Sequence, residues 1–80
     1  MVNRQTMTNW VLGALKSLGG HGTIMQICKK VWEMHREEIT GDAEMVYKWQ
    51  YEIRWSGNML RRERRLKQAS ESPRGIWELS

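Results

Sequence analysis

Apolar residues recur at helical spacing in three stretches of this 80-residue chain. The first stretch ends at Gly19-Gly20, a pair that can take the left-handed backbone of a helix terminus. Thr6 or Thr8 is the predicted cap of this first helix. Its apolar positions are Trp10, Val11, Ala14, Leu15 and Leu18. The pattern therefore predicts an amphipathic helix that ends before the glycines.

A second helix is predicted to begin after Thr23. Thr23 and Gln26 have the spacing of a capping box, in which each side chain accepts a bond from the other residue's backbone amide. The apolar stripe that follows comprises Ile24, Ile27, Cys28, Val31 and Met34, with Lys29, Lys30, Glu33 and Glu37 facing water. We expect this helix to run to about Glu38.

The third helix is predicted to follow the loop Thr40-Gly41-Asp42, with Asp42 as its cap, and to continue to about Arg62. Ile53 is taken as the centre of its buried face, with a rotation of about 100° per residue. The residues that then fall inward are Val46, Trp49, Gly57 and Leu60, and those that fall outward are Tyr47, Lys48, Tyr51, Trp55, Asn58 and Arg62. The small side chains of Ser56 and Gly57 would let another helix approach closely.

Two short strands are predicted over residues 65–69 and 75–79, because Leu66, Trp77 and Leu79 alternate with polar residues. Residues 70–74 would form the turn, and a small strand at His21-Gly22-Thr23 could complete the sheet. The pattern predicts one α+β domain over residues 1–80, a winged helix-turn-helix with three helices and a C-terminal β-hairpin wing. A three-helix bundle with a β tail also fits, but a hairpin without a core would be marginal.

The excess positive charge lies entirely in the second half of the chain. Five basic and five acidic residues balance up to residue 45, whereas eight basic residues face four acidic ones from residue 46 onward. This difference accounts for the net charge of +4. A one-sided basic surface indicates a polyanionic partner, nucleic acid first and an acidic membrane surface second.

The remaining composition argues against several other classes. Cys28 is the single cysteine, which excludes an intrachain disulfide and fits a reducing compartment. No apolar run has the length of a signal peptide or a membrane span. Cys28 and His35 would lie about 10 Å apart on one helix, too far to share a zinc ion without other ligands. We expect a cytoplasmic domain with no catalysis, no cofactor, no metal and no membrane partner.

Two segments carry a family resemblance. Residues 52–62, E-I-R-W-S-G-N-M-L-R-R, and residues 74–79, R-G-I-W-E-L, resemble the Mrr-type N-terminal domain. That family comprises winged-helix modules attached to restriction enzymes, and the chain is also similar to the winged-helix domain fused to the nuclease of methyl-adenine-dependent restriction endonucleases. The shared pattern is Ile/Val-Arg-Trp in the third helix, a Leu five residues later, and Arg-Gly-Val/Ile-Trp-x-Leu on the last strand. The first helix and the Thr23-Ile24 start of the second also fit, so that the resemblance covers nearly the whole chain.

The resemblance implies binding of double-stranded DNA without catalysis, and a nuclease domain in the same parent chain becomes a candidate partner. The chain departs from the family pattern after the third helix. There the family often has a glycine-centred turn, whereas this sequence has Glu63-Arg64-Arg65. The angle between this helix and the strands that follow is therefore open.

The outward face of the third helix is the predicted reading surface for the major groove. Lysine can bond to guanine, asparagine pairs with adenine, and aromatic rings contact base methyl groups. The candidates are Tyr47, Lys48, Gln50, Tyr51 and Asn58. For Tyr47, Lys48 and Tyr51, DNA contact and packing beneath the hairpin are equally compatible with the pattern. Trp55 is assigned to the framework.

A second group of residues is predicted to contact phosphate. This group comprises Arg61, Arg62, Arg64, Arg65 and Lys67, with Ser72 and Arg74 on the wing. Phosphate contacts fix orientation and make affinity depend on salt. The alternative is a solvated charged face. Arg54 is assigned to DNA and equally to an ion pair with Glu52, Glu78 or a neighbouring carboxylate.

Three further hypotheses remain open at this point. The aromatic third helix and the resemblance motivate reading of methylated adenine, which ranks below plain sequence-specific binding. A winged helix can also dock another protein, because Trp, Tyr and Arg are typical of interfaces. A small transcriptional regulator is the third hypothesis.

Overall fold

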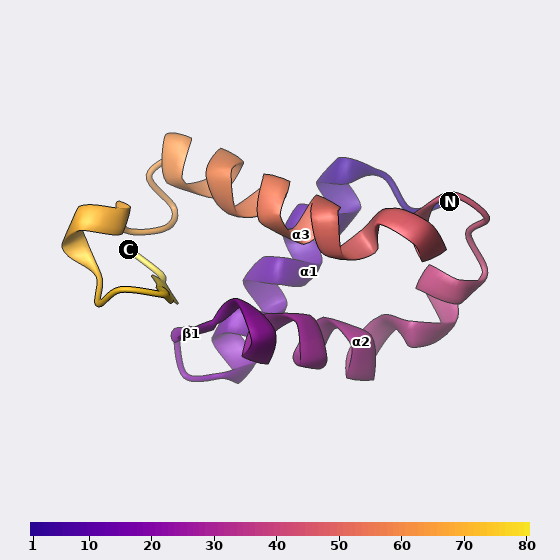
Figure 1. Ribbon diagram of the computed structural model, residues 1–80, viewed down its shortest axis with the longest axis horizontal. Helices are drawn as coiled ribbons and strands as arrows, with labels where there is room; N and C mark the ends of the chain where they lie inside the picture. Colours follow the sequence, from indigo (N-terminus) through magenta and orange to yellow (C-terminus); the bar gives the residue numbers. More distant parts are fainter.

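Three helices and a two-stranded antiparallel sheet make up the computed structural model, which describes residues 1–80. The elements follow one another as α1 (Arg4–Ser17), β1 (His21–Thr23), α2 (Ile24–Thr40), α3 (Met45–Arg62), a short 3₁₀ turn η1 (Ala69–Glu71) and β2 (Ile76–Glu78) (Figure 1). The α+β class is confirmed. None of the helices has the length and apolar character needed to cross a membrane.

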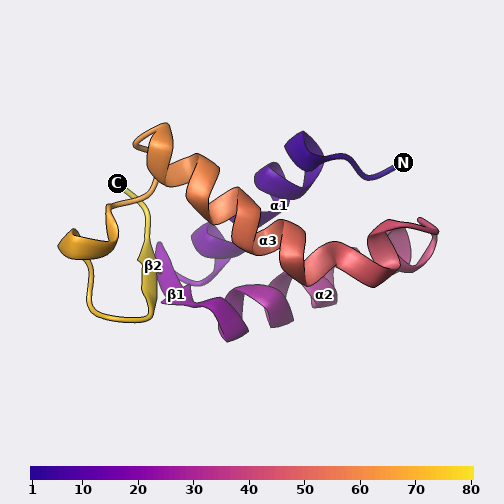
Figure 2. The ribbon, with the colours of Figure 1, turned by 45° about the horizontal axis from the view of Figure 1, so that its top comes forward.

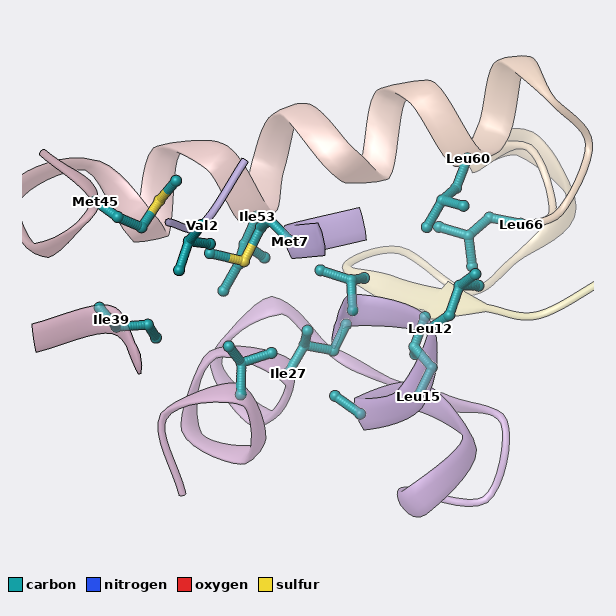
Figure 3. Packing of buried hydrophobic residues seen from close by; sticks show 13 residues of the cluster. Val2, Met7, Leu12, Leu15, Ile27, Ile39, Met45, Ile53, Leu60 and Leu66 are labelled. Atoms are coloured by element: carbon teal, nitrogen blue, oxygen red, sulfur yellow. The ribbon is translucent and has the colours of Figure 1, made fainter. Parts of the chain in front are cut away.

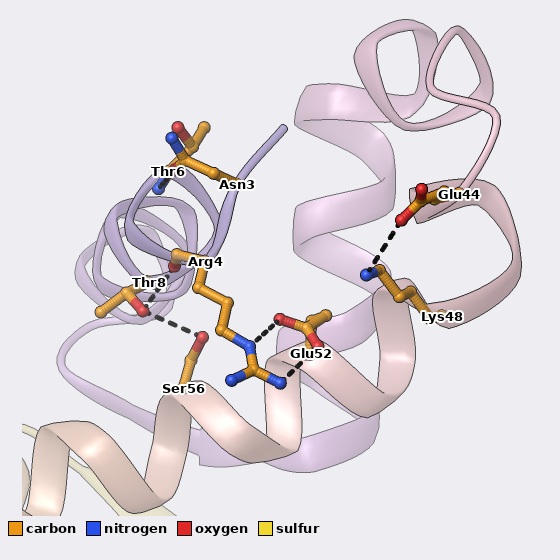
Figure 4. A network of polar contacts seen from close by, with 8 residues as sticks. All are labelled: Asn3, Arg4, Thr6, Thr8, Glu44, Lys48, Glu52 and Ser56. Carbon is orange, nitrogen blue, oxygen red and sulfur yellow. Dashed lines mark hydrogen bonds and ion pairs between the residues drawn. The ribbon is translucent and has the colours of Figure 1, made fainter. Parts of the chain in front are cut away.

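Helix α1 begins earlier than predicted. The side chain of Asn3 accepts a hydrogen bond from the Thr6 amide at 2.8 Å, so Asn3 is the cap and the assignment to Thr6 or Thr8 is wrong. Thr8 lies within the helix, where its hydroxyl donates to the Arg4 carbonyl and lies 3.1 Å from the Ser56 hydroxyl of α3 (Figure 4). The helix ends at Ser17 as expected, because Gly19 and Gly20 follow with positive φ angles.

Helix α2 begins with the predicted capping box, in which Thr23 Oγ1 and Gln26 Oε1 accept the amide of the other residue at 3.1 and 2.8 Å. Its backbone leaves helical geometry at His35, with φ −134° and ψ 19°. Beside this kink Met34 is exposed, so its place in the predicted apolar stripe is wrong, and Ile39 is buried in the following turn. The helix continues to Thr40, two residues beyond the predicted end.

Asp42 organises the start of α3. Its Oδ1 accepts the amides of Glu44 and Met45 at 3.1 and 3.0 Å, and its Oδ2 accepts the Val2 amide at 2.9 Å. Asp42 thus bonds to the first amide of α3, that of Met45, but the capping residue is Glu44, so the prediction of Asp42 as the cap is wrong. The same carboxylate holds the N-terminal arm against the connection between α2 and α3.

The sheet differs from the prediction in its second strand. Strand β1 pairs with β2, with Gly22 opposite Trp77, which confirms the predicted strand at His21–Thr23 (Figure 2). Residues 65–69 do not form a strand, because Leu66 makes a single bridge to Leu79 and η1 follows. The cause is local: the Gln68 amide donates to Glu71 Oε1 at 2.9 Å, which favours a turn over a ladder. The wing is consequently not a regular β-hairpin.

The core fills the space between the helices and the sheet (Figure 3). On α3, Ile53, Gly57 and Leu60 are buried as predicted, whereas Val46 and Trp49 are half-buried. Trp49 stacks on Trp32 of α2, with ring centroids 5.2 Å apart. The buried face of α3 also includes Met45, Glu52 and Ser56. The close approach of a helix occurs at Ser56, while Gly57 faces Trp77 of β2.

Candidate nucleic-acid interface

The side of α3 that faces away from the core carries most of the residues proposed to read DNA. At about 100° per residue, all of them lie within about 60° of one line along the helix. These residues, named here the α3 stripe, are Tyr47, Gln50, Tyr51, Arg54, Asn58, Arg61 and Arg62. All are exposed except Arg61, which is half-buried. Tyr47 is 91% exposed and Tyr51 61% exposed, so neither tyrosine packs beneath the C-terminal strands.

Six arginines from the middle of α3 onward make no ion pair. The basic groups that pair with a carboxylate are those of Arg4, Lys30, His35, Lys48 and Lys67. The six unpaired arginines are Arg54, Arg61, Arg62, Arg64, Arg65 and Arg74; Arg36 of α2 is also unpaired. Their guanidinium groups can therefore meet an incoming phosphate without first giving up a carboxylate.

The expected pairing of Arg54 with Glu52 or Glu78 is wrong. Glu52 is buried and bonds to Arg4, with Arg4 Nε 2.9 Å from Glu52 Oε1 (Figure 4). Glu78 pairs with Lys67 instead. Burial raises the pKa of the Cys28 thiol, and the positive charge of Arg54 opposes that rise.

Two of the candidate cations are already paired. Lys48 Nζ lies 3.5 Å from Glu44 Oε2, one helical turn earlier (Figure 4), and Lys67 Nζ lies 3.2 Å from Glu78 Oε2. Both pairs are exposed enough for water to screen them, and such pairs contribute about 0–1 kcal/mol each. Lys48 and Lys67 remain able to meet a phosphate, but each brings a carboxylate with it.

Trp55 lies on the side of α3 that approaches α1. Its ring is half-buried, and the Arg4 guanidinium lies 4.2 Å from the ring centre. Arg4 thus contacts Trp55 while it also bonds to Glu52. These contacts belong to the packing of α1 on α3.

The residues near the wing are arranged differently from the stripe. The guanidinium of Arg61 lies 5.5 Å from the ring centre of Trp77, and the Arg61 carbonyl accepts a bond from the Gln68 side chain at 2.9 Å. Arg65 and Arg74 are exposed. The Ser72 hydroxyl is shielded from solvent and has no hydrogen-bond partner, so it is not presented to a ligand in this conformation.

Lys29 of α2 was predicted only to face water, with no role in binding. It is exposed and makes no ion pair. It lies one helical turn from Trp32, which stacks on Trp49, so Lys29 is on the side of α2 that borders α3. The sequence shows that Lys29 lies one helical turn before Trp32. It does not show that Trp32 stacks on Trp49 of α3, so the position of Lys29 beside α3 could not be predicted.

Comparison with protein-family models, curated proteins and solved structures found no match. The resemblance to the Mrr-type domain therefore rests on the quoted residues. No three His, Cys, Asp or Glu side chains lie close enough together to hold a metal ion.

Proposed function

We propose that this chain is a non-catalytic winged-helix domain that binds double-stranded DNA through the α3 stripe. Its role would be that of a targeting module for a restriction-type endonuclease, or that of a small regulator. The observation that carries the proposal is the position of the stripe, which lies opposite the buried face of α3 and leads into unpaired arginines. An exposed helix face of this composition suits a major groove.

The arrangement of the strands supports the winged-helix assignment. β2 pairs with β1 on one edge and meets Leu66 on the other through a single bridge, and the Lys67 amide donates to the Glu78 carbonyl at 2.8 Å. Together these contacts are a minimal version of a three-stranded sheet, in which β1 lies between α1 and α2 and the other two segments follow α3. Residues 68–75 would then be the wing.

In the proposed complex, base contacts come from the middle of α3 and phosphate contacts from its end. Arg54 is suited to the guanine edge and Asn58 to the adenine edge, whereas Tyr47 and Tyr51 offer rings to base methyl groups. A methyl group on adenine would add apolar contact worth about 1 kcal/mol. Phosphate contacts would come from Arg61, Arg62, Arg64, Arg65, Arg74 and Lys29.

The proposal is tested by titrating the domain into a fluorescent random-sequence duplex at two salt concentrations. Each phosphate contact contributes about 0.9 to the slope of log affinity against log salt. Arg62→Gln and Arg65→Gln are each expected to weaken binding and to lower that slope by about one. Lys16→Gln, which removes an exposed charge from α1, is the matched control and leaves the slope unchanged. Absence of binding at low salt would contradict the proposal.

A second candidate function is docking of another protein through the same face. The exposure of Tyr47 and Tyr51 favours it, because tyrosine and arginine are enriched at protein interfaces. An affinity for DNA that does not respond to salt would favour this candidate. Methyl reading is tested separately on matched duplexes with and without methylated adenine, and equal affinities would remove it.

A further inference from the structure

A groove with an apolar floor and an acidic rim lies where α2 passes into α3. It encloses about 810 Å³ and is named here the acidic groove. Val2, Trp10 and Met45 contribute its apolar surface. The charged side chains that line it are Glu37, Glu38, Asp42, Glu44 and Lys48. The lining thus has four carboxylates and one lysine ammonium; Lys48 pairs with Glu44, and Glu38 pairs with His35.

The walls of the acidic groove are held in place by specific contacts. Asp42 fastens the N-terminal arm to the start of α3 through its bonds to the amides of Val2 and Met45. Trp10 is stacked on His35, with ring centroids 3.9 Å apart and planes 5° from parallel. The His35 ring in turn lies 3.0 Å from Glu38. Because these contacts fix its sides, the groove is formed before any partner arrives.

The other end of α3 has the opposite charge and the opposite shape. Arg62, Arg64 and Arg65, named here the arginine tip, are exposed and make no ion pair. The last turns of α3 project past α1 and α2, whereas the α2–α3 connection lies at the far end of the 36 Å long axis (Figure 1). The 18 residues of α3 separate the two ends by about 27 Å. The molecule is therefore bipolar along this helix.

We propose that the acidic groove receives the arginine tip of a second copy of this chain, so that copies associate head to tail. The concave groove carries an excess of carboxylates, of which Glu37 makes no ion pair, and the projecting tip carries cations without matching carboxylates. Each copy then has one groove and one tip, and the contact joins two different surfaces. A contact of this kind leaves a free groove and a free tip at the ends, so it extends with concentration instead of stopping at a dimer.

This inference does not depend on DNA binding. Where both proposals hold, a second copy and a phosphate backbone compete for the same arginines. Duplex DNA would then dissolve the head-to-tail chains.

The first test is sedimentation of the intact 80-residue chain at increasing concentration and low ionic strength. The weight-average mass is expected to rise with concentration and to return to that of a monomer at high salt, because salt screens exposed charges. A monomer at every concentration in low salt would overturn the proposal. A mass that rises without responding to salt would overturn it as well.

The second test separates the two surfaces. The groove variant Glu37→Gln/Glu38→Gln and the tip variant Arg62→Gln/Arg65→Gln are each expected to sediment as monomers. An equimolar mixture of the two still contains one intact groove and one intact tip, so it is expected to form a one-to-one dimer and nothing larger. Failure of the mixture to associate would refute a groove-to-tip contact.

Matched controls distinguish the contact from net charge. Glu63→Gln/Glu71→Gln changes the charge as much as the groove variant does, and Lys16→Gln/Lys30→Gln as much as the tip variant. Both controls are expected to associate as the unmodified chain does, and their loss of association would overturn the proposal. If an oligoarginine peptide binds the groove of a chain that stays monomeric, the groove serves another protein and self-association is rejected.

Discussion

The indole of Trp77 lies directly over Gly57 of α3. A Cβ atom built on Gly57 would lie 2.7 Å from Cζ3 and 2.9 Å from Cζ2 of this ring, closer than a methyl group can be accommodated. Glycine at this position is therefore what lets β2 rest on α3. The same ring lies beneath Arg61, so the position of an unpaired arginine depends on the glycine below it.

Gly57→Ala is expected to destabilise the fold. Displacing Trp77 costs about 1–3 kcal/mol, and the better helix propensity of alanine offsets part of this cost. Gly13→Ala is the matched control, since a Cβ there meets nothing within 4 Å, and it is expected to raise the free energy of unfolding by about 0.5–1 kcal/mol. Urea denaturation measures both. Equal stabilisation by the two alanines would show that Trp77 does not occupy this position.

Arg4→Met is expected to cost more stability than Glu52→Gln. The Glu52 side chain is 2% exposed, and removal of Arg4 leaves its charge buried without a partner. We expect a loss of about 1–3 kcal/mol, reduced from the value for a fully buried pair because Arg4 is half exposed. Glu52→Gln keeps an oxygen for Arg4, whose head reaches water. Urea denaturation of both single variants and the double variant should give a double-variant loss below the sum of the two.

Stability is expected to fall in acid partly through Asp42. The amides of Met45, Val2 and Glu44 donate to its carboxylate and hold its pKa below the ordinary range of aspartate. A lowered folded-state pKa means that this stabilisation is complete above the unfolded-state pKa and is lost as the pH falls through the folded-state value. Urea unfolding of the native chain and Asp42→Asn should therefore differ more at neutral pH than below about pH 4.

Glu38 titrates in the same direction, because its hydrogen bond with His35 lowers its pKa. Glu38 is present in both the native chain and Asp42→Asn, so its contribution cancels when their free energies of unfolding are subtracted. A difference between the native chain and Asp42→Asn that grows on acidification would contradict the assignment of these bonds.

Glu44→Gln is expected to strengthen DNA binding. The substitution releases Lys48 from its pair and removes a carboxylate that is 84% exposed beside the α3 stripe. Exposed pairs of this kind are weak, so the expected gain is at most about fivefold in affinity. Glu33→Gln is the control, because it changes the net charge equally and releases Lys30 on α2. Fluorescence anisotropy with the same duplex compares them, and equal gains would indicate an effect of net charge alone.

The helices could be predicted because the forces that begin and end them are local. Thr23 and Gln26 interact across three residues, and the glycines after α1 need no partner to turn the chain. The cap of α1 was misplaced because two threonines stood at plausible positions. Thr8 instead contacts Ser56, which is 48 residues away and invisible to local pattern.

The predicted strand over residues 65–69 failed for a related reason. Alternation of apolar and polar residues identifies a half-buried strand only when a partner strand extends along it. Here the turn formed by Gln68 and Glu71 interrupts the segment before such pairing can extend. A single bridge at Leu66 is what remains.

The residues on the outward face of α3 could be predicted from helix geometry, whereas the ion pairs made by residues of α3 could not all be predicted. The periodicity placed Tyr47, Tyr51 and Asn58 on one side without any tertiary information. The pairing of Arg4 with Glu52 spans 48 residues and could not be read from the chain. The pair of Lys48 with Glu44 was within reach, because residues four apart on a helix are neighbours.

Arg64 follows α3 with a φ of 60°, in the left-handed region that glycine occupies at lower cost. For an arginine this conformation costs about 1–2 kcal/mol. A glycine there would raise the free energy of unfolding but would remove one positive charge from the arginine tip. At this position, stability of the backbone favours glycine and positive charge at the end of α3 favours arginine. The chain has arginine, so it keeps the charge at a cost in stability.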